Sequence, residues 1–145
     1  MLLITKYHGT IEYNEEDIIT FKKGLPGFES LKKFIVVPFE DNEVFSILIS
    51  LEDTEVAIPV ISPFHVDETY EFKLSDEKIN ELNVNSQEDI LVLNTVTLNS
   101  NVKNITINMK APIIINIKGK IGEQIILDNE KYRIKKPLFK EESSC

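Results

Sequence analysis

Residues 44–51 read VFSILISL, and this stretch is the strongest indication of the fold. Six of its eight residues are apolar or aromatic with long or branched side chains, a composition typical of β-strands. Successive side chains of a strand point to opposite faces. The odd positions, from Phe45 to Leu51, would therefore share one face, and the pattern predicts that this face packs in the core.

Similar apolar runs occur along the rest of the chain, and they predict a protein built mainly of short strands. The runs are residues 18–21, 34–37, 56–61, 90–98, 105–109, 113–117 and 124–127. Pro59 cannot donate to a ladder, so its strand should lie at an edge or a bulge. Residues 128–131 read as a turn between 124–127 and 132–134, which predicts a hairpin near the C-terminus.

One short helix is expected after Ser75. Ser75 is a good N-cap, Asp76 and Glu77 suit the positive end of a helix, and Ile79 and Leu82 would share a face. Many strands with one short helix predict an all-β, mostly antiparallel domain, either a small barrel or a sandwich. Residues 1–139 are expected to form this single domain, and residues 140–145 to form a disordered tail.

Negative charge is concentrated in the first part of the chain. Residues 1–89 carry a net charge of −12 and residues 90–145 a net charge of +4, within a total of −8. Direct nucleic-acid binding needs clustered cations, so this distribution argues against it. An acidic protein attracts basic partners instead.

The sequence contains no recognisable catalytic or metal-binding motif. His8 and His65 are isolated from other ligands, and Cys145 is the single cysteine, so neither a metal, a cofactor nor an enzymatic activity is predicted. No apolar run is long enough to span a membrane, and the apolar start is too short for a secretory signal. We therefore expect a cytoplasmic protein that acts by binding other proteins.

Two acidic turns flank the strand at 44–51. If they do more than face solvent, they are candidates for contacting a cationic partner. The residues concerned are Glu40, Asp41, Glu43, Glu52, Asp53 and Glu55.

Two further motifs have defined local chemistry. Pro26-Gly27 fits a type II turn, because proline fixes φ at the first central position and glycine accepts a positive φ at the second. Residues 108–116 read NMKAPIIIN, where Pro112 interrupts a ladder between Asn108 and the strand that ends at Asn116.

Together these segments resemble the FliW family of flagellar assembly factors, and the resemblance extends over nearly the whole chain. It is carried by Gly24-Leu25-Pro26-Gly27-Phe28, Ser62-Pro63-Phe64, Tyr70-Glu71-Phe72 and residues 108–116. The chain departs from the family pattern at Met109, where leucine is usual, and at Ile49, where glutamine is usual. The resemblance implies a β-barrel-like fold without catalysis. It also implies two protein partners: flagellin, and the basic RNA-binding regulator CsrA, whose repression of flagellin translation would be relieved by binding.

A flagellin segment is apolar, so its receptor should be an apolar groove with a polar rim. The candidate residues are Ile61, Pro63, Phe64 and Tyr70, although Phe64 and Tyr70 could equally belong to the core. Two other classes of function are considered beside this one. The chain could be a small-molecule-binding barrel with a deep polar pocket, or a homo-oligomeric structural module.

Overall fold

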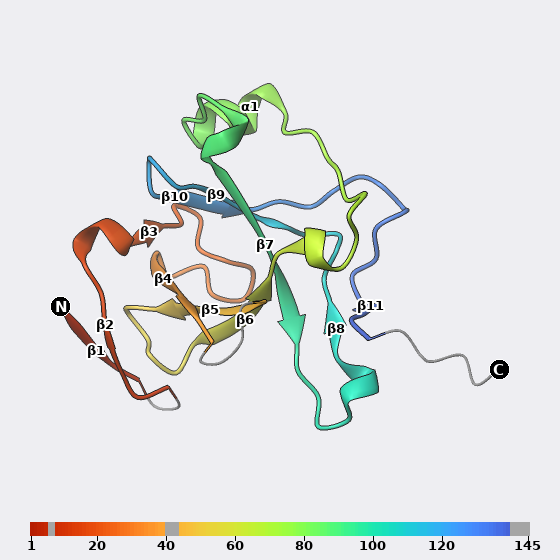
Figure 1. The fold of residues 1–145 in the computed structure, drawn as a ribbon. Helices are drawn as coiled ribbons and strands as arrows, with labels where there is room; N and C mark the ends of the chain where they lie inside the picture. Colours follow the sequence, from red (N-terminus) through yellow and green to blue (C-terminus); the bar gives the residue numbers. More distant parts are fainter. Residues whose placement is uncertain (6–7, 40–43, 140–145) are drawn as a thin grey trace.

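The computed structural model describes residues 1–5, 8–39 and 44–139 (Figure 1). The strands are β1 (Leu2–Ile4), β2 (Thr10–Glu12), β3 (Ile19–Thr20), β4 (Lys33–Pro38), β5 (Phe45–Ser50), β6 (Ala57–Ile61), β7 (Ile90–Thr97), β8 (Thr106–Ile107), β9 (Ile113–Asn116), β10 (Ile121–Gln124) and β11 (Lys136–Pro137). The α-helix is α1 (Asp76–Glu81), and the 3₁₀ turns are η1 (Glu15–Asp17), η2 (Pro63–His65), η3 (Gln87–Asp89) and η4 (Val102–Asn104). None of the helices in these ranges is long and apolar enough to cross a membrane.

Seven strands close into a barrel in the order β7-β6-β5-β4-β3-β10-β9, and β9 returns to β7. The pairings are antiparallel except between β10 and β3, where Ile121 lies opposite Thr20 in a parallel contact. The long strand β7 makes closure possible because its first half pairs with β9, while Thr95 and Asn94 pair with β6; its end extends beyond the ring to pair with β8. The prediction of a mostly antiparallel all-β domain with one short helix is confirmed, and of the two architectures that the sequence left open, the structure has the barrel.

The barrel interior is filled by side chains from strands all around the ring. Phe34 and Leu48 are fully buried there, together with Phe21, which follows β3. Phe21 lies against Gly122 of β10 so closely that a Cβ at position 122 would come within 2.6 Å of the Phe21 ring. Glycine at this position therefore allows the largest interior side chain to fit.

The prediction for β5 was half right, because both of its faces are buried and not only the face of Ile47 and Ile49. Ile47 and Ile49 point outward, where the β1–β2 hairpin covers them and Leu3 packs beside them. Leu48, on the face that the sequence disfavoured, points into the barrel. Both faces of β5 are buried because the hairpin adds an outer layer, and alternation within one strand cannot reveal that layer. The sequence analysis did not predict the β1–β2 hairpin itself.

The predicted C-terminal hairpin is wrong. Residues 125–135 form no strand, and they run instead along the loop between β8 and β9. The amides of Ile125 and Leu127 donate to the carbonyls of Pro112 and Lys110 at 3.0 and 2.7 Å, and the Met109 amide donates to the Arg133 carbonyl at 2.9 Å. The segment satisfies its backbone against a distant loop rather than against itself.

The local predictions at Pro59 and at the Pro26-Gly27 turn match the structure. Pro59 lies in the part of β6 whose register pairs it with β5, before β7 joins at Val60. Gly27 has φ +86° and the Phe28 amide donates to the Leu25 carbonyl at 2.7 Å, as in a type II turn. Leu25 before the turn packs in the core, whereas Phe28 after it is 37% exposed.

Candidate protein-binding site

A groove of about 640 Å³ lies beside α1 on the described surface. Eight apolar and five polar side chains line it. The apolar lining is Phe64, Tyr70, Phe72, Leu74, Ile79, Val84, Ile90 and Val92, and the polar lining is Glu71, Lys73, Asn85, Ser86 and Gln87. The lining of the groove is therefore mostly apolar.

One wall of the groove is the extended segment 70–74, which Tyr70 anchors. Its hydroxyl donates to the Met109 carbonyl at 2.7 Å, and the Glu71 amide donates to the Tyr132 hydroxyl at 2.9 Å. Burial raises the pKa of the Tyr70 phenol to about 12, so the hydroxyl remains a donor at any physiological pH. Asn94, fully buried, donates to the Asn108 carbonyl at 2.8 Å and fixes the same region.

The opposite wall is α1, whose two ends are fixed. As predicted, Ser75 caps the start of the helix by accepting from the Lys78 amide at 3.2 Å. The helix ends at Glu81, and Asn83 follows the C-cap Leu82 with φ +54°, a conformation that asparagine tolerates better than most residues. The Asn116 side chain then donates to the Leu82 and Asn83 carbonyls at 2.8 and 3.1 Å, which joins the end of the helix to β9.

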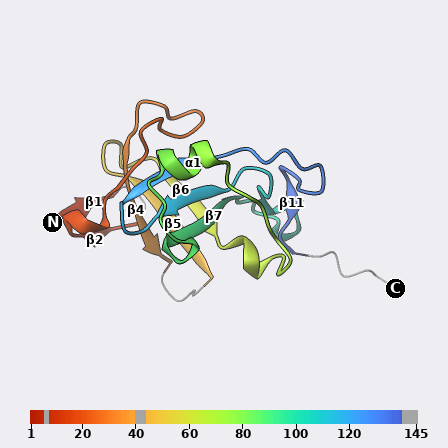
Figure 2. The same ribbon diagram turned by 90° about the horizontal axis from the view of Figure 1, so that it is seen from above.

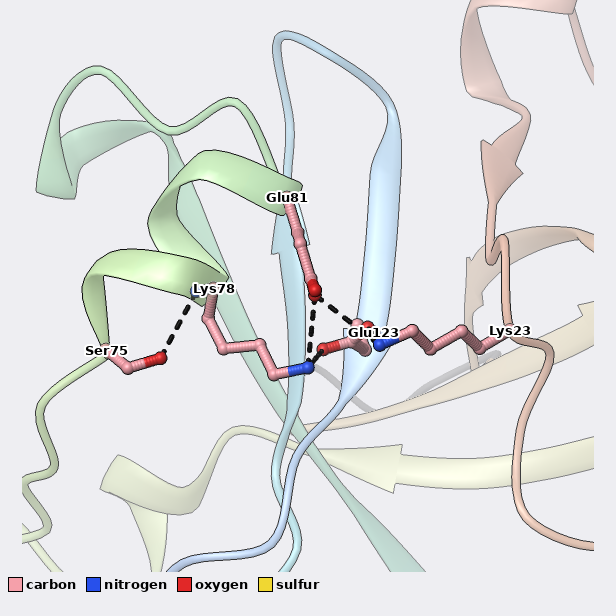
Figure 3. A network of polar contacts seen from close by, with 5 residues as sticks. All are labelled: Lys23, Ser75, Lys78, Glu81 and Glu123. Atoms are coloured by element: carbon pink, nitrogen blue, oxygen red, sulfur yellow. Dashed lines mark hydrogen bonds and ion pairs between the residues drawn. The ribbon is translucent and has the colours of Figure 1, made fainter.

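An ionic network holds α1 against β10 (Figure 3). Glu123 of β10 lies between two lysines, with Lys78 Nζ at 2.5 Å and Lys23 Nζ at 3.2 Å. Glu81 lies 3.1 Å from Lys78 and 3.5 Å from Lys23. Hydrogen bonding to Glu123, followed by that to Glu81, raises the pKa of Lys78, and the Lys78 hydrogen bond lowers the pKa of Glu81. With both walls anchored, the groove exists before any partner binds.

Of the four residues predicted to receive an apolar segment, only Phe64 is available on the surface. Its side chain is 47% exposed, and its ring meets the Tyr70 ring edge-to-face at 6.0 Å. Ile61 and Tyr70 are 2% and 3% exposed, and Pro63 is buried as well. Ile61, Pro63 and Tyr70 are therefore core residues, and Tyr70 contributes to the groove only from beneath.

The second acidic turn is more structural than the sequence suggests. The Glu52 carboxylate accepts hydrogen bonds from the Lys32 and Lys33 amides, and these lower its pKa. Asp53 accepts from the Glu55 amide at 3.1 Å. Glu55 is exposed, whereas Glu40, Asp41 and Glu43 lie outside the described residues.

The motif residues at 108–116 shape the barrel. The Asn108 side chain accepts from the amides of Lys110 and Ala111, both at 3.0 Å, which turns the chain from β8 into β9. Pro112 is buried next to this turn. At the other motif, a Cβ on Gly24 would lie 2.6 Å from the Glu29 backbone, so no larger residue fits there.

The two departures from the family pattern occupy buried sites. Met109 is 1% exposed and packs in the cluster that contains Tyr70 and Tyr132, while Ile49 is fully buried beneath the β1–β2 hairpin. A side chain at position 49 thus contacts the hairpin rather than solvent.

The sequence analysis missed most of the residues that frame the groove. Phe72, Ile79, Ile90 and Val92 resemble ordinary core positions, and Glu123 has no local partner that would single it out. The i,i+3 spacing of Lys78 and Glu81 on the expected helix was a usable signal for part of the network. Within the described ranges, no group of three or more histidine, cysteine or acidic side chains could hold a metal ion.

The barrel is closed and side chains fill its interior, while the apolar groove lies outside it. The chain is therefore a small β-barrel domain whose binding surface is on its outside. The family model described as FliW protein matches residues 2–138, and the chain belongs to the FliW family. Flagellar assembly factors FliW from Clostridium tetani and from Clostridium botulinum strain Okra are 60% and 58% identical to it, over 100% and 99% of this chain and all of theirs. A crystal structure of the flagellar assembly factor FliW superposes with a TM-score of 0.90 at 35% identity, covering 98% of this chain and 99% of that one.

Proposed function

We propose that this protein is a flagellar assembly factor that binds two proteins in exchange, a CsrA-type translational regulator and flagellin. Binding would remove the regulator from the flagellin message, and accumulating flagellin would then displace it. Such an exchange takes place where the message is translated, in the cytoplasm.

The observation that carries this proposal is the similarity to FliW proteins over the full length of the chain. Relatives at 60% identity share the fold and most of the surface, so a shared role is the simplest expectation. The role proposed here needs binding surfaces rather than reacting groups.

The charge distribution supports the regulator as a partner. The net charge of −12 in residues 1–89 attracts a cationic RNA-binding protein and repels RNA. Glu55 is a candidate for a direct contact because it is exposed at the second acidic turn, whereas the Glu52 carboxylate has a structural role in binding the Lys32 and Lys33 amides. Glu40, Asp41 and Glu43 remain candidates on sequence grounds, together with Asp53 at the same turn as Glu55.

The apolar groove supports flagellin as the second partner. Its mostly aromatic and aliphatic lining is the type of surface that receives the apolar face of a helix. Phe64 is partly exposed at this groove, and exposed aromatic residues often dominate binding energies.

An electrophoretic shift assay tests the proposal. The purified protein should form no complex with a flagellin leader RNA, but it should dissociate a preformed complex of that RNA with a CsrA-type protein. Adding flagellin should restore the complex. Tight binding of RNA by this protein alone, or an unaffected regulator complex, would contradict the proposal.

A small-molecule-binding barrel is less well supported. Phe21, Phe34 and Leu48 fill the barrel interior, and the described grooves lie outside it. A homo-oligomeric module would be detected as a stable oligomer in the same preparation, without capture of either partner.

A further inference from the structure

The N-terminal hairpin has a strand edge that no described residue covers. β1 pairs only with β2, and the two strands form a sheet of their own. The hairpin lies on the side of the molecule opposite β11, as both ribbon views show (Figures 1 and 2). One edge of β1 is therefore free for pairing.

The hydrogen-bond register identifies which backbone groups face that edge. Met1 and Tyr13 exchange both of their backbone hydrogen bonds, at 2.7 and 2.9 Å, and the Thr5 amide donates to the Gly9 carbonyl at 2.9 Å. In an antiparallel pair, bonded positions alternate with unbonded ones. Leu2 and Ile4 therefore direct their N–H and C=O groups away from β2, and no described group satisfies them.

The side chains at the same two positions are also unusual. Leu2 is 70% exposed and Ile4 is 77% exposed, whereas Leu3 between them is 8% exposed and packs on the barrel. Proteins normally protect a free strand edge with charged side chains, proline or a bulge. Apart from its length of three residues, none of these devices protects the Leu2–Ile4 strand, which combines open backbone groups with exposed apolar side chains.

The charged side chains of β1, β2 and η1 are carboxylates, and the N-terminal ammonium of Met1 donates to the Tyr13 carbonyl. Glu12 lies directly opposite Leu2 on β2, and the exposed residues Glu15, Glu16 and Asp17 follow in η1. A second copy of this chain, with its net charge of −8, would bring a second set of carboxylates to the same place. A cationic strand would meet charges of the opposite sign.

We propose that the free edge of β1 is a docking site for an extended segment of a cationic protein, which adds to the hairpin as a third strand. Strand addition of this kind takes its affinity from backbone hydrogen bonds and its specificity from alternate side chains. The segment would pair with the N–H and C=O groups of Leu2 and Ile4. Glu12, directly opposite Leu2, projects on the same face as Leu2 and Ile4. Basic side chains of the segment on this face would pack their apolar stems beside Leu2 and Ile4 and direct their charges toward Glu12. The site is separate from the groove and from the turn at Glu55, so it does not depend on the proposed function.

A titration followed by amide chemical shifts tests this site directly. The probe is a short peptide of alternating lysine and valine, compared with the same peptide carrying N-methyl groups on alternate amides and with a glutamate–valine version. The amides of Leu2 and Ile4 should shift with the first peptide, and much less with the other two. Equal shifts with the N-methylated peptide, or shifts confined to the groove, would overturn the proposal.

Two variants and a matched control separate docking from folding. Ile4→Pro removes the outward amide without touching the bonds to β2, and should weaken peptide binding by roughly three- to tenfold, the equivalent of one backbone hydrogen bond. Ile4→Thr keeps the amide and removes apolar contact, so it should also weaken binding. Ile126→Thr changes an isoleucine of matching exposure, 76%, outside the hairpin, and should have no effect.

Sedimentation at rising protein concentration tests the alternative occupant. The protein should remain monomeric under conditions in which it binds the lysine–valine peptide. A dimer that forms in the wild type and is lost in Ile4→Pro would identify a second copy as the occupant and would overturn the proposal of a cationic partner. Unchanged peptide binding by a folded Ile4→Thr or Ile4→Pro protein would also overturn it.

Discussion

Replacing Phe64 by alanine tests the groove most directly, because the expected loss of stability can be worked out from the structure. The ring is 47% exposed, so about half of the 1.5–3 kcal/mol gained by burying a phenylalanine is at stake, roughly 1 kcal/mol. Loss of the edge-to-face contact with Tyr70 at 6.0 Å adds about 0.5 kcal/mol or slightly more. For a domain of this size, 1–2 kcal/mol lowers the melting temperature by about 3–8 °C.

The binding effect should be larger than the stability effect. An exposed aromatic anchor in a groove can contribute about 2 kcal/mol to binding, so capture of flagellin should weaken about thirtyfold. Calorimetric melting and titration with purified flagellin on the same variant measure both quantities. Phe139→Ala is the matched control, because Phe139 is 45% exposed and does not line the groove.

Two results would refute this reasoning. Loss of a fully buried phenylalanine such as Phe34 costs about 3–5 kcal/mol, so a loss of that size in Phe64→Ala would mean that Phe64 is part of the core. Normal capture by a well-folded Phe64→Ala protein would remove the groove as the flagellin site.

Three further predictions concern the acidic turn, the glycine turn and the ionic network. In stopped-flow measurements at low salt, Glu55→Lys should slow association with a CsrA-type protein more than Glu130→Lys does, because long-range attraction acts mainly on the association rate. Equal effects of the two variants would argue against a localised acidic site. Gly24→Ala should lower the melting temperature more than Gly27→Ala, since both have a positive φ but only position 24 has backbone within 2.6 Å of the added Cβ, and similar midpoints would contradict this. Lys78→Met should reduce the free energy of unfolding, measured in guanidinium, by about 1–3 kcal/mol, a value between those for exposed and buried ion pairs. The reason is that Glu123, whose side chain is 11% exposed, keeps only its ion pair with Lys23. A loss below about 0.5 kcal/mol would mean that the network stabilises little.

The features that the sequence predicted are those controlled by nearby residues. The strand pattern at 44–51, the Ser75 cap and the Pro26-Gly27 turn each depend on a few neighbouring positions, and the structure has all three. The predicted C-terminal hairpin failed because Leu127 and Arg133 bond to a loop whose position depends on barrel closure. The sequence also could not show that Leu48 points into the barrel and Ile47 toward the hairpin, since both side chains are apolar and both are buried.

The sequence by itself determined the class of fold, the single helix and the acidic character of the first part of the chain, because composition and alternation act over a few residues. Only the tertiary structure decided which apolar residues became core and which became surface. Ile61, Phe64 and Tyr70 look alike in the sequence, yet Phe64 alone among them remains exposed at the groove. The walls of that groove depend on contacts between residues far apart in the chain, such as Lys78 with Glu123 and Asn116 with Leu82. These contacts exist only after the barrel has closed, and no local pattern specifies them.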